Sequence, residues 1–436
     1  MKRNYLLLAM VLQLQIIPVA TFADTQNFEG IKNQYAEEQE PTHAKVYING
    51  FYYNLYDETK EAEVTHGDDP YTYEGNITIP STVNYKGTTY NVTCIGDKAF
   101  RGMKGLTSID FPNSVTSIGE LAFSNCGLTT LVLPNSLTSI GYAAFGECYK
   151  LQSITIPQNV SYIGRTPFSG CAGIKTIIVD KDNETYNSGD NCNAIIHTET
   201  NELIQGCQNT VIPNTVKRIA KYAFGGMTTL TSIDIPNSVT NIGACAFSNC
   251  GLTTLTIPNS VVYIGNSIVT GNAHLKSITL SESLKDIPEG TFEGCDALES
   301  ITIPASVESI EWYAFSDCKN LKSIYFQSTT PPVANINYFY VNTVDNFRSF
   351  VNNVTIHVPA GCKDDYRTTT NEAFNEVWKD IKIVDDVVIP KPVTGIATMP
   401  TSINQHPTTI FDITGKRLTK VQKGINIING KKVIIK

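Results

Sequence analysis

A repeat of 22 or 23 residues constrains this chain more than any other feature. The stretch from Leu230 to Gly251, LTSIDIPNSVTNIGACAFSNCG, differs at few positions from the stretch from Leu106 to Gly127, LTSIDFPNSVTSIGELAFSNCG. Copies begin at Leu106, Leu128, Leu151, Ile174, Leu230, Leu252, Leu275, Leu298 and Leu321, and the interval after Ile174 also holds a degenerate copy and an insertion. Such a period predicts a solenoid, because each unit buries its apolar face only by stacking on its neighbours.

Each copy predicts two short strands and a turn. Leu106, Ile109 and Phe111 are expected to point inward on a first strand, and Pro112 ends this strand because it lacks a backbone donor. A second inward-facing segment follows at 115–118, and 122–126 predicts a helical or 3₁₀ turn that closes the rung. We therefore expect a β-rich solenoid, capped at both ends, whose first strands form one parallel sheet along the column.

The outward positions of the first strands are uniform and supply the candidate binding residues. Ser or Thr recurs two residues after each repeat start, and many copies carry Thr two residues further on. Hydroxyl side chains suit a solvated β surface, and the same array is a flat face on which a protein, a glycan or ice could dock. The candidates for a binding face are Ser153, Thr155, Thr254, Thr256, Ser277, Thr279, Ser300, Thr302 and Tyr325.

Most of the eleven cysteines occupy one repeat position. Cysteines fall 20 residues after six of the repeat starts, at Cys126, Cys148, Cys171, Cys250, Cys295 and Cys318. Met103, Met227 and Asn272 take this position in other copies, which indicates a buried slot rather than a disulfide framework. We expect buried thiols stacked from rung to rung.

The insertion near 180–210 predicts a hairpin between 193–197 and 202–206. If His197 faces Glu202, then Cys192 and Cys207 also face each other, and a disulfide between them is possible. The preceding run Asp180-Lys-Asp-Asn-Glu184 suggests calcium, but an EF-hand loop requires Gly and Glu at positions where this chain has Thr185 and Asn191. An ordinary polar loop is the favoured interpretation, and no metal or cofactor is assigned.

The ends of the chain differ from the repeats. Residues 1–23 predict an export signal, with Lys2 and Arg3 before an apolar run and a cleavage site after Ala23. No stretch is long and apolar enough to predict a transmembrane helix. We divide the remainder into an N-terminal β-hairpin cap (24–75), the solenoid (76–327), a C-terminal cap (328–384) that includes a helix at 364–378, a linker (385–400) and a small β tail (401–436) of two hairpins.

Charge and motifs exclude several function classes. The chain has a net charge of −8, and its body is more acidic because the stretch after residue 384 carries eight basic and three acidic residues. An acidic body repels phosphate backbones, so nucleic acid is not an expected partner. The six histidines are scattered, and no HExxH, GxSxG, Walker or GxGxxG motif is present. We do not expect an enzyme.

The repeat LxxIxIPxSVxxIGxxAFxxC resembles the BspA-type leucine-rich repeats of exported bacterial proteins over about residues 76–327. This resemblance implies a leucine-rich solenoid at the bacterial cell surface or secreted, with adhesion to matrix proteins or cells in some members. The tail IFDITGKRLTKVQKGINIINGKKVIIK is similar to C-terminal segments that direct cargo through type IX secretion.

These observations predict an exported, non-catalytic repeat protein that presents an extended surface to proteins or glycans, as a cell-surface adhesin does. Two alternatives come from other classes: an accessory carbohydrate-active or peptidase-associated surface protein, and a structural component of a surface layer.

Overall fold

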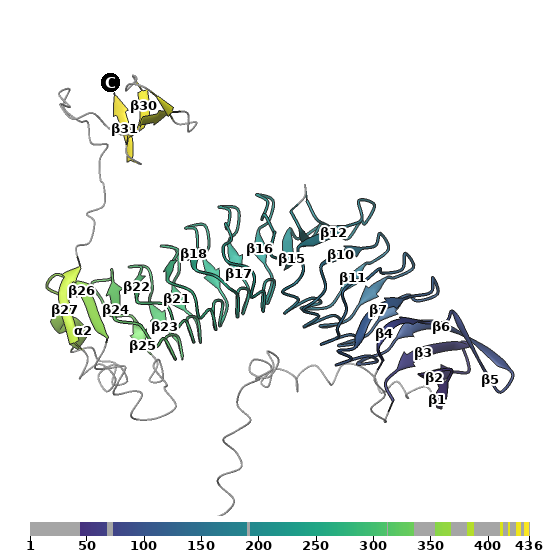
Figure 1. Cartoon of the computed structure of the whole chain (residues 1–436). Helices are drawn as coiled ribbons and strands as arrows, with labels where there is room; N and C mark the ends of the chain where they lie inside the picture. The colour runs from purple at the N-terminus through teal and green to yellow at the C-terminus, as the bar shows by residue number, and fades with distance from the viewer. Residues whose placement is uncertain are drawn as a thin grey trace, which may run out of the picture.

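The computed structural model describes residues 44–67, 73–189, 192–311, 313–334, 354–367 and 382–387, and the tail strands at 410–412, 417–418, 424–428 and 431–435. Successive rungs stack side by side in a curved column (Figure 1). The predicted signal segment 1–23 and residues 388–400 of the predicted linker lie outside the described residues, whereas residues 385–387 of that linker belong to a strand.

The N-terminal end of the column is a sheet of longer strands. Its strands are β1 (Ala44–Ile48), β2 (Phe51–Tyr56), β3 (Glu61–Thr65), β5 (Thr82–Tyr85) and β6 (Thr88–Ile95). Asn49 and Gly50 join β1 to β2 with φ of 48° and 96°, and Lys86 and Gly87 join β5 to β6 with φ of 51° and 87°. Both turns therefore have the two left-handed residues that are typical of tight two-residue hairpins.

Most rungs contribute two parallel strands, as predicted, and the rungs that begin at Leu128 and Leu230 keep only the second strand. The first strands are β7 (Leu106–Asp110), β10 (Ser153–Ile156), β12 (Thr176–Val179), β18 (Thr254–Thr256), β20 (Ser277–Thr279), β22 (Ser300–Ile303) and β24 (Ser323–Phe326), and β4 (Gly75–Thr78) precedes them. The second strands are β8 (Ser117–Ile118), β9 (Ser139–Ile140), β11 (Tyr162–Ile163), β16 (Arg218–Ile219), β17 (Asn241–Ile242), β19 (Tyr263–Ile264), β21 (Asp286–Ile287), β23 (Ser309–Ile310) and β25 (Val333–Ala334).

The prediction of one sheet of first strands along the whole column is wrong. In the described residues the first strands form separate sheets, β4–β7, β10–β12, β18–β20 and β22–β24 with two C-terminal strands. Residues 128–133 and 230–235 lack strand geometry, although Thr129 N still donates to Thr107 O at 2.9 Å. The second strands are more continuous, because β8, β9 and β11 extend the N-terminal sheet in register through β6.

The turn that closes each rung differs from the predicted helical turn. Its backbone has residues in the left-handed region at two fixed positions, such as Leu121 (φ 54°) and Asn125 (φ 58°) in the rung that begins at Leu106. This alternation breaks a helix but aims N–H groups at the next rung. The N–H groups of Leu121, Phe123 and Asn125 donate to the carbonyls of Tyr142, Ala144 and Gly146 at 2.7–2.8 Å. The turns thus form a third hydrogen-bonded ladder.

Phenylalanine rings stack inside the turns and fill the core. Phe100, Phe123, Phe145 and Phe168 form one stack, with ring centroids 5.1–5.4 Å apart and planes within 8° of parallel. Phe224 stacks on Phe247 at 5.2 Å further along the column. All six rings are fully buried, so each rung covers the apolar ring of its neighbour.

The inserted hairpin divides the core. Strands β14 (Ala194–His197) and β15 (Glu202–Gly206) pair antiparallel, and β13 (Tyr186–Asn187) lies beside β14. Ile195 belongs to the hydrophobic cluster of the N-terminal half, whereas Ala194 and Ile196 belong to that of the C-terminal half. The column therefore has two large cores that meet at this hairpin, rather than one continuous core.

The C-terminal end repeats the parallel pattern without the repeat sequence. Strand β26 (Thr355–Pro359) pairs with β24, and β27 (Lys382–Val387) pairs with β26. The predicted helix is present as α2 (Lys363–Arg367), and its predicted continuation lies outside the described residues. In the tail, β28 (Ile410–Asp412), β29 (Arg417–Leu418), β30 (Gly424–Ile428) and β31 (Lys431–Ile435) form the two predicted hairpins within one four-stranded sheet.

Candidate functional site

The candidate hydroxyl residues lie in two rows on the outward face of the first strands. Ser153 pairs with Thr176, Thr254 with Ser277, and Ser300 with Ser323. The second row runs two residues further along each strand, where Thr256 pairs with Thr279 and Thr302 with Tyr325. The structure therefore brings residues 23 positions apart into adjacent places, although gaps between the sheets separate Ser153 and Thr155 from the C-terminal candidates.

Exposure agrees with this arrangement. Eight of the candidates, all Ser or Thr, are exposed, whereas the Ile or Leu residue between each pair is buried, as Leu255, Ile278 and Ile301 show. Strand alternation places the hydroxyls in solvent because the apolar neighbours face the core. Tyr325 is half-buried, since its ring packs against the next strand.

The packing of Tyr325 against the next strand extends the second row at its C-terminal end. The residues that extend it lie outside the repeats. The His357 ring on β26 stacks on Tyr325 with centroids 4.2 Å apart and planes 20° apart. His357 Nδ1 lies 2.8 Å and 3.0 Å from the two carboxylate oxygens of Asp386 on β27. Sequence reasoning counted His357 among scattered histidines. Apolar and polar residues alternate within Thr355–Pro359 as they do in the first strands. This alternation is the signal that could have predicted the outward position of His357.

The N-terminal half of the same face is less hydroxylic. Val132 and Ile178 are 79% and 49% exposed at the positions that carry Thr in the C-terminal half. Asp110 accepts hydrogen bonds from Asn76 Nδ2 at 3.0 Å and Thr78 Oγ1 at 3.3 Å. One strand face thus presents two chemically different surfaces.

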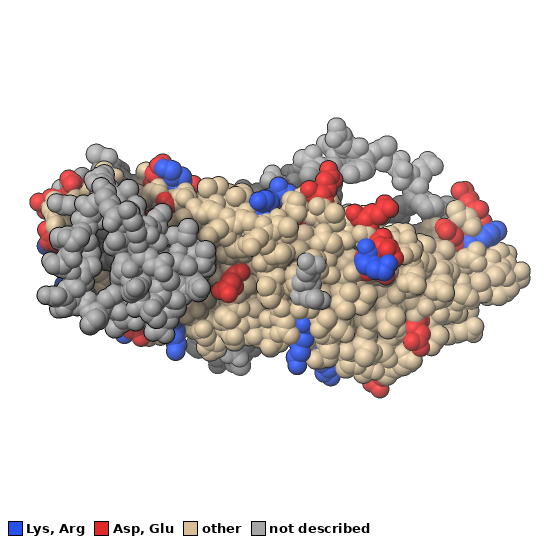
Figure 2. Space-filling model, turned by 90° about the horizontal axis from the view of Figure 1, so that it is seen from above, with Lys and Arg blue, Asp and Glu red and all other residues tan. Residues whose placement is uncertain are grey.

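Charged side chains are sparse over much of the column. Figure 2 shows the face seen from above, where the lysine, arginine, aspartate and glutamate side chains between the two ends are few and scattered. Several charged residues pair between rungs, such as Lys322 with Glu299 at 3.0 Å and Lys319 with Asp296 at 2.8 Å. On the described part of this face, most of the surface therefore comes from uncharged residues.

The buried cysteines act as hydrogen-bond donors between rungs. Each thiol at the repeated position donates to a carbonyl of the preceding rung, as Cys126 Sγ does to Phe100 O at 2.9 Å and Cys171 Sγ to Phe145 O at 3.0 Å. Asn272 makes the equivalent bond to Phe247 O at 2.8 Å. The prediction of buried, stacked thiols is confirmed, and the hydrogen bond explains why Asn substitutes for Cys here.

These thiols are poor nucleophiles. Burial raises the pKa of Cys126, Cys250 and Cys295 to about 12. Burial likewise raises the pKa of Cys171 and Cys318 well above the ordinary value. Because the thiolate is the reactive form, these buried thiols are unreactive near neutral pH.

The Cys192–Cys207 disulfide is absent from the structure, and both residues are free thiols. His197 does pair with Glu202, but a bulge between Ile195 and Ile196 shifts the register of the hairpin by one residue. The two cysteines therefore no longer lie opposite each other. Cys207 Sγ instead donates to Asn193 O at 3.4 Å.

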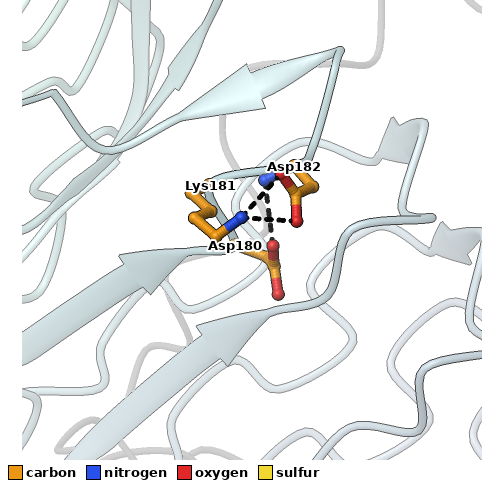
Figure 3. Close-up of polar contacts among 3 residues, drawn as sticks. All are labelled: Asp180, Lys181 and Asp182. Atoms are coloured by element: carbon orange, nitrogen blue, oxygen red, sulfur yellow. Dashed lines mark hydrogen bonds and ion pairs between the residues drawn. The ribbon is translucent and has the colours of Figure 1, made fainter.

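The acidic run before the hairpin forms a local polar turn (Figure 3). Lys181 Nζ lies 2.8–2.9 Å from both carboxylate oxygens of Asp182, and Asp180 Oδ1 accepts the backbone N–H of Asp182 at 2.9 Å. Asn183 is buried and donates to Pro157 O and Val160 O at 2.8 Å and 2.9 Å. These polar side chains therefore form their hydrogen bonds with other groups of the chain. In the described residues, no group of three or more His, Cys, Asp or Glu side chains could hold a metal ion.

Comparison with known protein families shows which family has this repeat. The family described as BspA type Leucine rich repeat region matches residues 76–194 and 201–322 in six copies, which is more than half of the chain. The chain belongs to the BspA-type leucine-rich repeat family. This family consists of repeat scaffolds without catalytic machinery, and the chain is such a scaffold. Among curated proteins, none matches the sequence.

Solved structures of bacterial leucine-rich repeat proteins are similar to this chain. A leucine-rich repeat protein from Eubacterium ventriosum is 20% identical, with a TM-score of 0.51 over 79% of this chain and 95% of its own. This likeness shows the fold. A leucine rich cell surface protein from Faecalibacterium prausnitzii is 22% identical, with a TM-score of 0.41 over 70% of this chain and 97% of its own. The pneumococcal vaccine antigen PcpA is 17% identical, with a TM-score of 0.46 over 79% and 99%.

No helix in the described part of the chain has both the length and the apolar character needed to cross a bilayer.

Proposed function

We propose that this protein is an exported adhesin whose C-terminal strand face binds a protein or glycan ligand at the bacterial cell surface. The observation that carries the proposal is the double row of exposed hydroxyls on β18, β20 and β22. The exposed hydroxyls repeat with the spacing of the rungs, and an extended ligand with repeated polar groups meets several of them at once. The half-buried Tyr325–His357 pair ends the row.

Uncharged hydroxyls support recognition by many modest hydrogen bonds rather than by a few strong charge pairs. Each such bond contributes roughly 0.5–1.5 kcal/mol, so affinity grows with the number of rungs engaged. Family membership and the expected export signal at 1–23 support a location outside the cytoplasm.

The test uses a variant that removes hydroxyls from the face while leaving the core unchanged. Thr254→Ala, Thr256→Ala, Ser277→Ala and Thr279→Ala together alter two adjacent strands. The matched control carries Ser161→Ala, Thr200→Ala, Thr215→Ala and Thr228→Ala, which remove exposed hydroxyls elsewhere. We expect saturable binding on a panel of immobilised matrix proteins and glycans, with binding lost in the face variant and kept in the control.

Other outcomes distinguish the alternatives. Turnover of a panel member would identify an accessory enzyme, and an absence of both binding and turnover would favour a structural surface component. Thermal hysteresis on freezing would identify ice as the ligand of the hydroxyl rows. Equal loss of binding in the two variants would show that the strand face is not the site.

We further propose that the tail directs surface display. Deletion of Thr401–Lys436 is expected to leave the protein in the periplasm, as measured by cell fractionation and by protease accessibility of intact cells. Unchanged surface display after this deletion would remove the sorting role of the tail without affecting the binding face.

A further inference from the structure

A small cavity lies where the N-terminal sheet meets the turn of the first rung. Its volume is about 250 Å³, slightly below the range of roughly 300–1,000 Å³ for pockets that enclose drug-sized ligands. One side comes from β2 and the chain that follows β3, and the other comes from the first turn. The lining residues are Tyr52, His66, Gly67, Tyr73, Lys98, Ala99, Arg101 and Met103.

The described lining of this cavity is basic, whereas the chain as a whole is acidic. Its described lining contains three basic side chains, those of His66, Lys98 and Arg101, and no acidic one, whereas the whole chain carries −8. Across the part of the chain that the structure describes, the side chains of Lys98 and Arg101 form no ion pair or hydrogen bond. Two cations are thus available for an anion, and Arg101 can bind a carboxylate through two parallel hydrogen bonds.

The turn ladder begins at this cavity and leaves carbonyl acceptors free. In the second rung, the carbonyls of Ala122 and Ser124 accept the N–H groups of Phe100 and Gly102. The equivalent carbonyls of the first rung belong to Ala99 and Arg101, which have no preceding turn. Among the described residues no donor reaches them. The cavity therefore combines cations with acceptors that need hydrogen-bond donors from a ligand.

The walls of the cavity are held in place. The Tyr73 ring stacks on Phe51 at 5.4 Å, and its hydroxyl donates to Gly50 O at 2.9 Å. The Tyr52 ring lies against Gly67, where a Cβ atom would come within 2.2 Å of the ring. Because these groups are fixed before a ligand arrives, binding costs little ordering of the protein.

We infer that this cavity binds an acidic sugar unit, a single ring that bears a carboxylate. The carboxylate meets Lys98 and Arg101, the ring hydroxyls donate to the free carbonyls, and the apolar C–H edge of the ring contacts Tyr52 and Met103. An acidic peptide side chain or inorganic phosphate would satisfy the cations but would bring fewer donors for the carbonyls. The cavity lies apart from the hydroxyl rows of the strand face, so the inference stands even if that face binds nothing.

The experiment titrates the purified chain with sodium D-glucuronate and N-acetylneuraminate by calorimetry and ligand-observed NMR. D-glucose, sodium acetate and oligoglutamate are the comparison probes. We expect at least one acidic sugar to bind at least tenfold more tightly than glucose or acetate, with affinity that falls as salt rises. Equal binding of acetate or glucose, tighter binding of oligoglutamate, or no binding of either acidic sugar at millimolar concentration would overturn the inference.

Two variants locate the binding. Lys98→Gln with Arg101→Gln removes the cations and is expected to reduce affinity at least tenfold, whereas the control Lys150→Gln with Lys175→Gln changes two exposed lysines elsewhere and should leave it unchanged. Gly67→Ala leaves every charge in place but displaces the Tyr52 ring, and should also weaken binding. Circular dichroism confirms folding of each variant. Unchanged affinity in both folded cavity variants would contradict the assignment.

Discussion

The turn that closes each rung and the strand that begins it have opposite properties. The turns form an inter-rung hydrogen-bond ladder, enclose stacked phenylalanines and carry buried cysteine donors. The first strands form interrupted sheets, and their outward residues vary, with exposed Val132 and Ile178 in one half and threonine in three neighbouring rungs of the other.

This difference shows how the fold separates stability from recognition. The turn positions are fixed because each ring and thiol must fit both its own rung and its neighbour. An outward strand position contacts solvent, so its side chain can change without disturbing the stack. Binding chemistry can therefore diversify on the strand face while the turns keep the column intact.

High pH is expected to give the largest effect and to act on the turn side. The unfolded chain loses its thiol protons near the ordinary pKa of 9.0, whereas the folded chain holds those of Cys126, Cys250 and Cys295 until about pH 12. Their stabilisation is thus complete below pH 9 and is lost as the pH rises from 9 to 12, by about 1.4 kcal/mol for each pKa unit of each thiol. Urea unfolding at pH 8, 9 and 10 should show a falling free energy of unfolding.

The control for this experiment is the double variant Cys250→Ala with Cys295→Ala. Its free energy of unfolding should fall less steeply above pH 9 than that of the unmodified chain. The same slope in both proteins would show that these thiols do not control the pH dependence.

Removal of one stacked ring is expected to give the next largest effect. Phe145 is fully buried between Phe123 and Phe168, so Phe145→Ala should lower the free energy of unfolding by about 3–5 kcal/mol. Val132→Ala in the same rung, at a position that is 79% exposed on the strand face, should change it by about 0.5 kcal/mol or less. Chemical denaturation measures both, and similar losses would contradict the division between turn and strand face.

The hydrogen bond of the cysteine ladder can be tested at the position that carries asparagine. Asn272 Nδ2 donates to Phe247 O, but its Oδ1 is buried without a partner. Asn272 Nδ2 also donates to Val269 O at 2.8 Å. Asn272→Cys keeps the bond to Phe247 O, loses the bond to Val269 O and removes the unpaired acceptor, so the free energy of unfolding should change by less than about 1 kcal/mol. Asn272→Ala removes the donor as well, and should lower it by about 1–3 kcal/mol. If Asn272→Cys is less stable than Asn272→Ala, the thiol is not an effective donor in this slot.

The smallest effect is expected from the charge pairs beside the strand face. Lys322 and Glu299 lie 3.0 Å apart, but both side chains are more than 60% exposed. Lys322→Gln should therefore change the free energy of unfolding by less than about 0.5 kcal/mol, and 1 M salt should remove the difference. A loss of several kcal/mol would show that the strand side holds the column together as strongly as the turns do.

Much of the fold could be predicted from local pattern. The positions of Ile109, Val115, Ile118 and Phe123 follow from period and polarity, and all four are buried. Asn49-Gly50 predicts its hairpin because those residues tolerate the left-handed conformation. The turn conformation could not be predicted this way, since Leu121 and Tyr222 adopt it although they have no intrinsic preference for it.

The candidate sites also differ in whether a local sequence pattern predicts them. The exposed hydroxyl rows could be predicted because identical positions of stacked repeats must meet. The Tyr325–His357–Asp386 cluster and the Lys98–Arg101 cavity could not, because their members come from segments with no shared pattern. The Cys192–Cys207 pairing failed for a related reason: one bulge at Ile195–Ile196 changes the register, and the hairpin sequence does not reveal it.

By itself, the sequence determined the period, the inward-facing residues and the buried position of the cysteines, because a copy that repeats every 22 or 23 residues can cover its apolar side chains only with its neighbours. The tertiary structure decided the left-handed turns, the division of the core at the inserted hairpin and the charged cavity at the first rung. Each of these depends on hydrogen bonds and packing between residues far apart in the chain, whose geometry no local pattern of side chains contains.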